Sequence, residues 1–344
     1  MSSKNDCAKN DCPKNECSTS INVGPPVKRK FRTGSYLIYD DPVDPKLPNN
    51  QCGNTNLRLG TSLSDTPFRA SGSHQLNVGR LATVLKQVAP SGGQLYLVDL
   101  REETHLYFDG CAVSWYADKD FANVGQSLEW IEAEEKARVA VITAVPHTKM
   151  FCITPEDKKS GNVTPTGYSE VAVKLALTEQ GIASTLPFRP RYIRIPVTDH
   201  CRPSEEALNR FVDLCKSLNT GDWVHCHCHG GDGRTTTFLA LFDMVHWAKA
   251  KGTSNFPTLE DFAQRQCQIF HYCLNPVGCQ NAPGCTSGIS TTDDWKYCLA
   301  FERWLFLEAV RTWIANGGLS SGKPFSLPKG WDQSLPPLCQ TNRP

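Results

Sequence analysis

The chain has 344 residues, and its 36 Lys and Arg nearly balance its 35 Asp and Glu, so the formal net charge is +1. This balance excludes a protein that coats nucleic acid through its overall charge. No apolar run reaches the roughly 18 residues of a membrane-spanning helix, and we expect no secretory signal peptide because the first twenty residues lack an apolar segment. An anionic ligand must therefore meet a local cluster of basic side chains.

The chain contains sixteen cysteines. A chain of this length buries a large core without covalent help, so we expect mostly unpaired, buried thiols in a reducing compartment. Cys273, Cys279 and Cys285 recur every six residues in a loop rich in Gly, Pro and Asn. Because this spacing differs from the Cys-x-x-Cys of zinc sites, a metal or a disulfide there is the alternative.

Both ends of the chain differ in composition from the middle. Residues 1–30 contain three short polar repeats, each ending in a cysteine (Cys7, Cys12 and Cys17), and have no apolar periodicity. We expect a disordered tail whose cysteines could bind metal or cross-link. Residues 321–344 are rich in proline, and we expect an irregular peripheral segment there.

Between these tails, strand-like and helix-like patterns alternate. Short apolar or alternating runs predict strands at residues 95–98, 139–145, 192–197 and 223–226. Apolar residues at helical spacing predict helices over residues 208–218 and 238–245, from residue 258, and over residues 294–315. This alternation indicates an α/β fold with a largely parallel central sheet.

The segment that carries chemistry is residues 225–235, His-Cys-His-Cys-His-Gly-Gly-Asp-Gly-Arg-Thr, at a strand-to-helix junction. Its glycines allow a tight curl with several N–H groups pointing inward, and the helix adds its positive N-terminus. Such a loop binds a tetrahedral dianion. The same field favours a thiolate at Cys228, which makes it a candidate nucleophile, while the guanidinium of Arg234 can hold two phosphate oxygens.

Two other interpretations of this segment compete with the phosphate loop. Alternating His and Cys could bind a metal, but residues i and i+2 of a strand lie roughly 6.7 Å apart, and no Cys-x-x-Cys accompanies them. A nucleotide-binding P-loop would need Gly-x-x-x-x-Gly-Lys-Ser/Thr, which is absent. We therefore expect neither metal nor cofactor.

A cysteine phosphatase also needs an acid to protonate the leaving oxygen. Asp199 follows the strand at residues 192–197 and precedes Cys228 by 29 residues (228 − 199). This separation fits one helix and one return strand, so we expect both side chains at the same end of adjacent parallel strands, with Asp199 on a mobile lid. The alternative is an aspartate that only caps a turn or a helix.

Several segments together resemble the protein-tyrosine-phosphatase-like (PTP-like) cysteine phytases, which hydrolyse inositol polyphosphates. In family order these are Phe68-Arg69-Ala70-Ser71-Gly72-Ser73, the run Asp99–His105, Val113-Ser114-Trp115-Tyr116, Thr198-Asp199-His200, the Cys228 loop and Trp295-Lys296. The resemblance covers roughly residues 65 to 315. It implies a PTP-like phosphatase domain over residues 31–320, with a small inserted β-rich domain near residues 112–165.

The resemblance also implies roles for individual residues. Cys228 would be the nucleophile, Arg234 the phosphate clamp and Asp199 the general acid. The substrate pocket would include His200, Arg69, Lys296 and the loop residues His229, Gly230, Gly231, Asp232 and Gly233. In the mechanism that follows, we expect Thr235 to donate to the sulfur of Cys228 and His227 to hold the loop backbone.

A substrate with many phosphates needs concentrated positive charge. The basic candidates for this pocket are Arg69, Arg101, His105, His200, Arg202, Arg265 and Lys296. The family loop commonly carries Glu, Ala and Val where this chain has His229, Gly230 and Asp232. The carboxylate of Asp232 either turns away into a hydrogen bond or biases which inositol phosphate is preferred.

We therefore expect a phosphatase of myo-inositol hexakisphosphate or lower inositol phosphates, acting through a phosphocysteine. One alternative is a protein tyrosine or dual-specificity phosphatase, and another is an inactive phosphate-binding module. The expected partner is a small polyanion, with no nucleic acid and no membrane span. The lack of a signal peptide favours a cytoplasmic protein, and the polar N-terminus would also suit an effector exported into a host cell.

Overall fold

The computed structural model describes residues 36–41, 55–117, 120–152, 167–270, 272–278, 285 and 295–341. The chain divides into two compact units. The first unit comprises Met1–Thr55, Gln75–Gln87 and Glu102–Arg189. The second unit comprises Asn56–His74, Val88–Arg101 and Pro190–Pro344.

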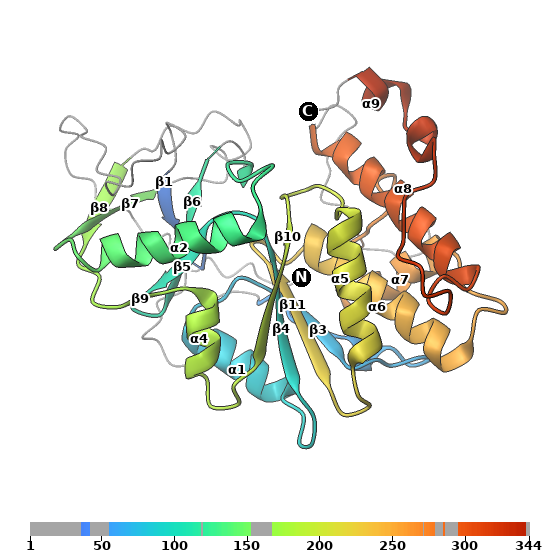
Figure 1. The fold of residues 1–344 in the computed structure, drawn as a ribbon, viewed down its shortest axis with the longest axis horizontal. Helices are drawn as coiled ribbons and strands as arrows, with labels where there is room; N and C mark the ends of the chain where they lie inside the picture. The colour runs from blue at the N-terminus through green and yellow to red at the C-terminus, as the bar shows by residue number, and fades with distance from the viewer. Residues whose placement is uncertain are drawn as a thin grey trace, which may run out of the picture. The chain divides into compact units, whose positions relative to one another are not determined.

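Five strands of the second unit form one sheet (Figure 1). Their order is β10 (Arg191–Val197), β4 (Leu95–Arg101), β11 (Trp223–Cys228), β3 (Ala70–His74) and β2 (Arg58–Leu59). The first four strands run parallel, and β2 pairs antiparallel with β3. A short 3₁₀ helix, η1 (Gly60–Ser62), follows β2. The parallel sheet confirms the α/β fold expected from the alternating pattern.

The topology corrects one expectation. Val197 ends β10 and Cys228 ends β11, so Asp199 and Cys228 do follow the same end of the sheet. They are not on adjacent strands, because β4 lies between β10 and β11. Every residue of β4 is buried. Such a continuously buried strand suits a central position, where neighbours cover both edges and helices cover the faces.

Four long helices belong to the same unit (Figure 1): α5 (Glu205–Ser217), α6 (Gly233–Lys251), α7 (Leu259–Ile269) and α8 (Trp295–Ala315). Each coincides with a predicted helix. The side chain of Ser204 caps α5, accepting from the Ala207 N–H at 3.0 Å. Thr258 and Asp261 form a reciprocal capping box at the start of α7.

Helix α6 is the most buried of these helices. Phe238 and Phe242 on α6 pack near Phe211 of α5, and the rings of Phe211 and Phe238 meet edge to face, 4.8 Å apart. Burial of each ring contributes about 2–3 kcal/mol. The helix that follows the Cys228 loop is therefore held firmly in the core.

The first unit is built on antiparallel pairing. One sheet has the order β1 (Tyr36–Tyr39), β6 (Cys111–Tyr116), β5 (His105–Phe108) and β9 (Ala176–Leu177), and β7 (Thr148–Cys152) pairs with β8 (Gly167–Val171). Its helices are α1 (Val78–Val88), α2 (Leu128–Ile142) and α4 (Glu179–Thr185). The unit includes residues 112–165, and the small β-rich insertion expected there stays a prediction.

The strand predicted at residues 139–145 is wrong, because residues up to Ile142 belong to α2. Ser127 caps this helix by accepting from the Trp130 N–H, and Arg138 pairs with Glu134 one turn away at 3.0 Å. A short apolar run is compatible with a buried strand or a buried helix face. The cap at Ser127 and the ion pair between Glu134 and Arg138 both stabilise a helix, so the apolar run continues it.

The cysteines depart in part from the expected thiols. Cys215, Cys226 and Cys228 are buried thiols, but Cys267 is bonded to Cys285 and Cys298 to Cys339. The expectation of unpaired thiols is wrong for these pairs. The sulfur of Cys273 lies within 4.8 Å of those of Cys267 and Cys285. Cys279 and the N-terminal repeat lie outside the described residues.

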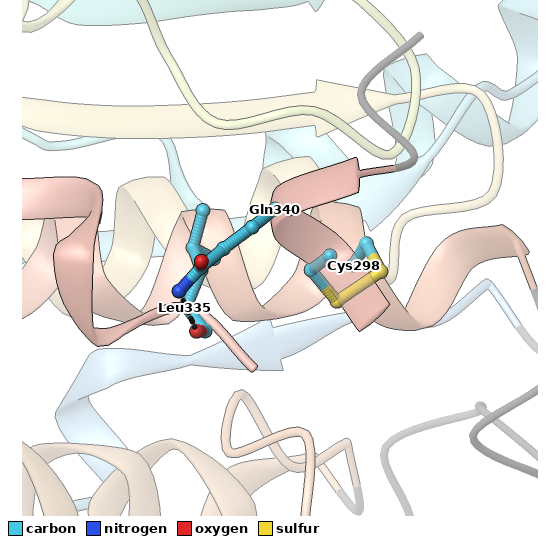
Figure 2. The surroundings of a disulfide bond; sticks show 4 residues. Cys298, Leu335 and Gln340 are labelled. Carbon is cyan, nitrogen blue, oxygen red and sulfur yellow. Dashed lines mark hydrogen bonds between the residues drawn. A yellow bond between two sulfur atoms is a disulfide. The ribbon is translucent and has the colours of Figure 1, made fainter. Parts of the chain in front are cut away.

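The Cys298–Cys339 bond ties the C-terminal segment to α8 (Figure 2). Its Cα atoms lie 5.1 Å apart, within the range for disulfides. This segment was expected to be irregular, but it contains the 3₁₀ helix η3 (Trp331–Ser334) and α9 (Pro337–Thr341). Beside the disulfide, the Gln340 side chain donates to the carbonyl of Leu335 at 2.9 Å. In the part of the chain that the structure describes, no helix is long and apolar enough to span a membrane.

Candidate active site

The centre of the site is the loop from Cys228, the last residue of β11, to Gly233, the first residue of α6. Cys228 is only 2% exposed, and its sulfur accepts a hydrogen bond from the Thr235 hydroxyl at 3.1 Å. Gly231 has φ of +75°, and a Cβ there would lie 2.6 Å from the backbone nitrogen of His74. Only glycine fits this turn, which brings the loop against the end of β3.

Arg234 connects this loop to the end of β10. Its side chain is buried in the first turn of α6, and Nη1 donates to the carbonyl of Val197 at 3.1 Å. Nη2 lies 3.0 Å from Oδ1 of Asp199. The guanidinium therefore bridges the loop and the aspartate, the arrangement needed by a group that holds an anion between nucleophile and acid.

Asp199 has a second basic neighbour. Nε2 of His200 lies 3.1 Å from Asp199 Oδ2. Burial acts to raise the pKa of Asp199, but the charges of Arg234 and His200 outweigh it, so the pKa lies well below its usual value. With both partners in place the carboxyl group is ionised.

Asp232, which departs from the family loop, lies on the exposed side of the loop. Desolvation raises its pKa and the charge of Asp199 adds to this, while Arg58 and His200 oppose it. Its Oδ1 lies 3.5 Å from the side-chain nitrogen of Asn56. The carboxylate therefore accepts a hydrogen bond, and whether it also biases the choice of inositol phosphate stays a prediction. His229, next to Cys228, is half-buried and adds to the positive field at Asp199.

His227 is buried in β11, at the register of Ser73 in β3 and Asp99 in β4. Its expected role in holding the loop stays a prediction.

Lys296 lies on α8 seven residues before Arg303, so the two share nearly one helical face. Arg303 donates to the carbonyl of His200 at 3.1 Å. Lys296 is thereby on the face of α8 that the His200 loop contacts.

Several basic residues predicted for the pocket lie elsewhere. Arg69 precedes β3, at the end of the sheet opposite Cys228, and donates to the carbonyls of Gly221 and Asp222 at 3.1 and 3.2 Å. Arg265 donates two hydrogen bonds to the carboxylate of Asp243, at 2.8 and 2.9 Å. These two side chains are engaged in holding the fold.

The other basic candidates are also occupied or distant. Arg202 stacks on the ring of Trp331 at 4.8 Å. His105 belongs to the first unit, where it pairs with Glu179 at 3.0 Å. Arg101 ends β4 at the register of Val197, and so does reach the site end of the sheet.

Four further residues support the site around the loop. Asn56 and Arg58 contact the backs of Gly230 and Gly231. His225 in β11 accepts or donates between the hydroxyls of Ser71 and Ser73, at 2.8 and 3.0 Å, and Arg303 holds the His200 carbonyl as described above. Asn56, Arg58 and Arg303 act across long sequence distances, so no local motif indicates them. His225, by contrast, lies within the segment of residues 225–235 that the sequence singled out.

The two buried thiols near Cys228 differ from it in environment. Burial is the main cause that raises the pKa of Cys215 to about 12, and burial likewise raises that of Cys226. Both stay protonated at neutral pH. Of the three thiols, Cys228 alone lies at the start of the glycine loop that leads into α6, and its sulfur accepts a hydrogen bond from the Thr235 hydroxyl.

Comparison with known proteins agrees with this geometry. Residues 98–246 match the model of the PTP-like phytase family, a family described by the compound inositol hexakisphosphate. The chain is 31% identical over 164 residues to effector protein hopD2 of Pseudomonas syringae pathovar tomato, a match that covers 47% of this chain and 34% of hopD2.

Two solved structures share the fold. One is the PTP-like myo-inositol phosphatase of Mitsuokella multacida in complex with myo-inositol-(1,3,4,5)-tetrakisphosphate. It matches with a TM-score of 0.68 and 24% sequence identity, and the match covers 89% of this chain and 48% of that chain. The other is a PTP-like phytase of Bdellovibrio bacteriovorus, with a TM-score of 0.61, 25% identity, and coverage of 89% and 96%. This chain spans about a third of hopD2 and about half of the Mitsuokella protein. These matches confirm the resemblance to PTP-like phytases and the fold it implied.

Proposed function

We propose that this chain, similar in sequence and fold to PTP-like phytases, is a cysteine-dependent phosphomonoesterase that removes phosphate from inositol polyphosphates, myo-inositol hexakisphosphate among them. The observation that carries the proposal is the constellation of Cys228, Arg234 and Asp199. Arg234 contacts Asp199 at 3.0 Å from the helix turn that closes the Cys228 loop. All three residues lie at the carboxyl end of the parallel strands, which supports these roles.

In the first step the substrate phosphate enters the loop and takes the place of the Asp199 carboxylate on Arg234. Asp199 loses the partner that held its pKa low and faces a dianion instead, so its pKa rises and it takes up a proton. The Cys228 thiolate then attacks phosphorus in line, the S–P bond forms, and the bond from phosphorus to the inositol oxygen breaks. Asp199 gives that oxygen its proton.

In the second step water attacks the phosphocysteine. Asp199, now a carboxylate, accepts the proton of the water as the O–P bond forms and the S–P bond breaks. The Thr235 hydroxyl, 3.1 Å from the sulfur, stabilises the departing thiolate. The loop N–H groups and Arg234 carry the charge of the transferring phosphoryl group in both steps.

The test is phosphate release from myo-inositol hexakisphosphate and from a phosphotyrosine peptide, under reducing conditions. We expect release from the inositol compound by the native chain and its loss, by more than about 10³-fold, in Cys228→Ser. The matched control is Cys226→Ala, which removes a buried thiol from the same strand. Turnover of the peptide alone would keep the chemistry and replace the substrate. Phosphate binding with no turnover of either would indicate the inactive binding module.

The likeness to hopD2, an effector protein, supports the further proposal that this chain acts inside a host cell. A fusion to a reporter enzyme that is active only in host cytosol tests this. A signal that requires the secretion machinery of the producing cell is expected, and a reporter retained in the producer contradicts it.

A further inference from the structure

Behind the Cys228 loop, two side chains donate to backbone carbonyls of the loop. The Asn56 side chain donates to the Gly230 carbonyl at 2.8 Å. Nη2 of Arg58 donates to the Gly231 carbonyl and, at 3.0 Å, to the Thr236 hydroxyl. Both donors come from the short segment at the edge strand β2, more than 170 residues away along the chain.

These bonds have a consequence for the opposite face of the loop. In a trans peptide the C=O of one residue points away from the N–H of the next. A donor that holds the Gly230 carbonyl outward therefore turns the Gly231 N–H inward, and the bond to the Gly231 carbonyl does the same for the Asp232 N–H. Inward N–H groups are what a phosphate-binding loop needs.

Arg58 is itself fixed on several sides. It is 2% exposed, and its guanidinium lies 4.2 Å from the centre of the Phe270 ring. Nη1 donates to the carbonyl of Asn56 at 3.2 Å, which links the two donors. Burial lowers the pKa of Arg58 to about 10, with the charges of Cys228 and Asp232 opposing the shift, so it stays cationic at neutral pH. The protein therefore keeps a buried positive charge beneath the loop.

We infer that Asn56 and Arg58 are positioning residues for phosphoryl transfer: they hold the Gly230 and Gly231 carbonyls so that the following N–H groups face the transferring phosphate. Neither side chain touches the substrate. The inference deepens the proposed function, since it concerns the same loop. The loop would bind any phosphate by this device, whichever substrate the chain turns over.

The test therefore uses two probes that do not depend on the inositol substrate. One is hydrolysis of an aryl phosphate, and the other is the affinity of the Cys228→Ser protein for inorganic phosphate, measured by calorimetry. Asn56→Gly removes the side chain and suits the backbone of Asn56, whose φ is +50°. We expect kcat to fall about tenfold and phosphate to bind several-fold more weakly, with KM for the aryl phosphate changed less than kcat.

At Arg58, two variants separate charge from the hydrogen-bonding fork. Arg58→Met is expected to lower kcat by about 10²-fold. Arg58→Lys keeps the charge but not the fork, and it is expected to recover only part of that loss. The matched control is Arg311→Met, which removes an arginine that also donates to two backbone carbonyls, those of Pro257 and Phe256, away from the loop. It should lower thermal stability and leave kcat and phosphate affinity unchanged.

Native phosphate affinity and native kcat in folded Asn56→Gly and Arg58→Lys would overturn the inference. If Arg58→Met does not fold, Asn56→Gly decides alone, because it leaves the buried cation in place. Failure of the proposed function would look different. The native chain would release no phosphate from the inositol compound, while the variants would still differ in phosphate affinity.

Discussion

The two ends of the five-stranded sheet use the same chemical device for different purposes. At the amino ends of the parallel strands, Arg69 donates to the carbonyls of Gly221 and Asp222 and lies over Trp223. At the carboxyl ends, Arg58 donates to the carbonyl of Gly231 and Arg234 to that of Val197. An arginine that donates to backbone carbonyls closes a turn at one end and, in the proposed function, shapes an anion site at the other.

What separates the two ends is the polarity of the backbone. The carboxyl ends lead into loops whose N–H groups and helix N-terminus are positive, and α6 begins there. Cys228 ends β11, Arg234 lies in the first turn of α6, and Asp199 follows β10 at this same end. At the amino ends, Arg69 contacts the carbonyls of Gly221 and Asp222 and the ring of Trp223, so its charge holds structure. Substitutions at the carboxyl ends should therefore lower the catalytic rate, whereas substitutions at the amino ends should lower stability.

Among the variants that test this contrast, the largest effect is expected for Asp199→Asn. The amide cannot donate a proton to the inositol oxygen or accept one from water, so kcat should fall about 10²–10⁴-fold. In the native chain the protonated form of Asp199 becomes scarcer as pH rises, so activity should decline toward alkaline pH. That decline should be absent in the variant. Phosphate release measured from pH 4 to pH 9 tests both points, and an alkaline decline that persists in Asp199→Asn would assign the acid to another group.

The same aspartate links pH to stability. Its pKa in the folded chain lies below the unfolded value, so its ion pair contributes fully above the usual carboxyl pKa of about 4. The contribution is lost as pH falls through the depressed value. The difference in unfolding free energy between native chain and Asp199→Asn should accordingly be constant near neutrality and change only in acid.

A second prediction concerns the support of the Asp199 loop from the C-terminal segment. Arg202 stacks on Trp331, and the Cys298–Cys339 bond closes a loop of 41 residues that contains Trp331. Cys339→Ala should lower the free energy of unfolding by up to about 4 kcal/mol, from the chain entropy that the bond removes in the unfolded state. Unfolding in denaturant without reductant measures it. Native stability in the variant would show that the bond does not constrain the unfolded chain.

This second prediction also bears on rate. If Trp331 steadies Arg202 and the loop around Asp199, Trp331→Ala should lower kcat several-fold with the disulfide intact. Trp331→Phe keeps a ring for the guanidinium and serves as the matched control. Equal rates for both variants would separate the C-terminal segment from the chemistry.

The sequence predicted the parts of this site that are local in the chain. The Cys228 loop, Arg234 and Thr235 fall within eight residues, and the hydrogen bond expected from Thr235 to the sulfur is present. Asp199 was found because it follows a strand with a clear alternating pattern. The helices α5, α7 and α8 were found because their apolar residues recur at helical spacing within short stretches of the chain.

Features that depend on residues far apart in the chain could not be predicted from the sequence. Arg58 reaches the loop from 173 residues away, and no pattern near a two-residue strand indicates it. The position of β4 between β10 and β11 depends on how strands compete for the centre of the sheet, which spacing alone does not show. Arg69 was assigned to the pocket because it is basic and resembles a family segment. Residue type does not say which end of a strand a side chain occupies.

Arg69→Met tests that last distinction and should have the smallest effect. Its two bonds to backbone carbonyls lie at an exposed turn, so their loss should lower the free energy of unfolding by about 1 kcal/mol. Phosphate release from the inositol compound should keep its native kcat/KM, because the guanidinium lies beyond the far end of β3 from Cys228. Denaturant unfolding and phosphate release on the same preparation measure both. A fall in kcat/KM at native stability would place Arg69 in contact with substrate, and the two ends of the sheet would then not divide structure from catalysis as the present geometry requires.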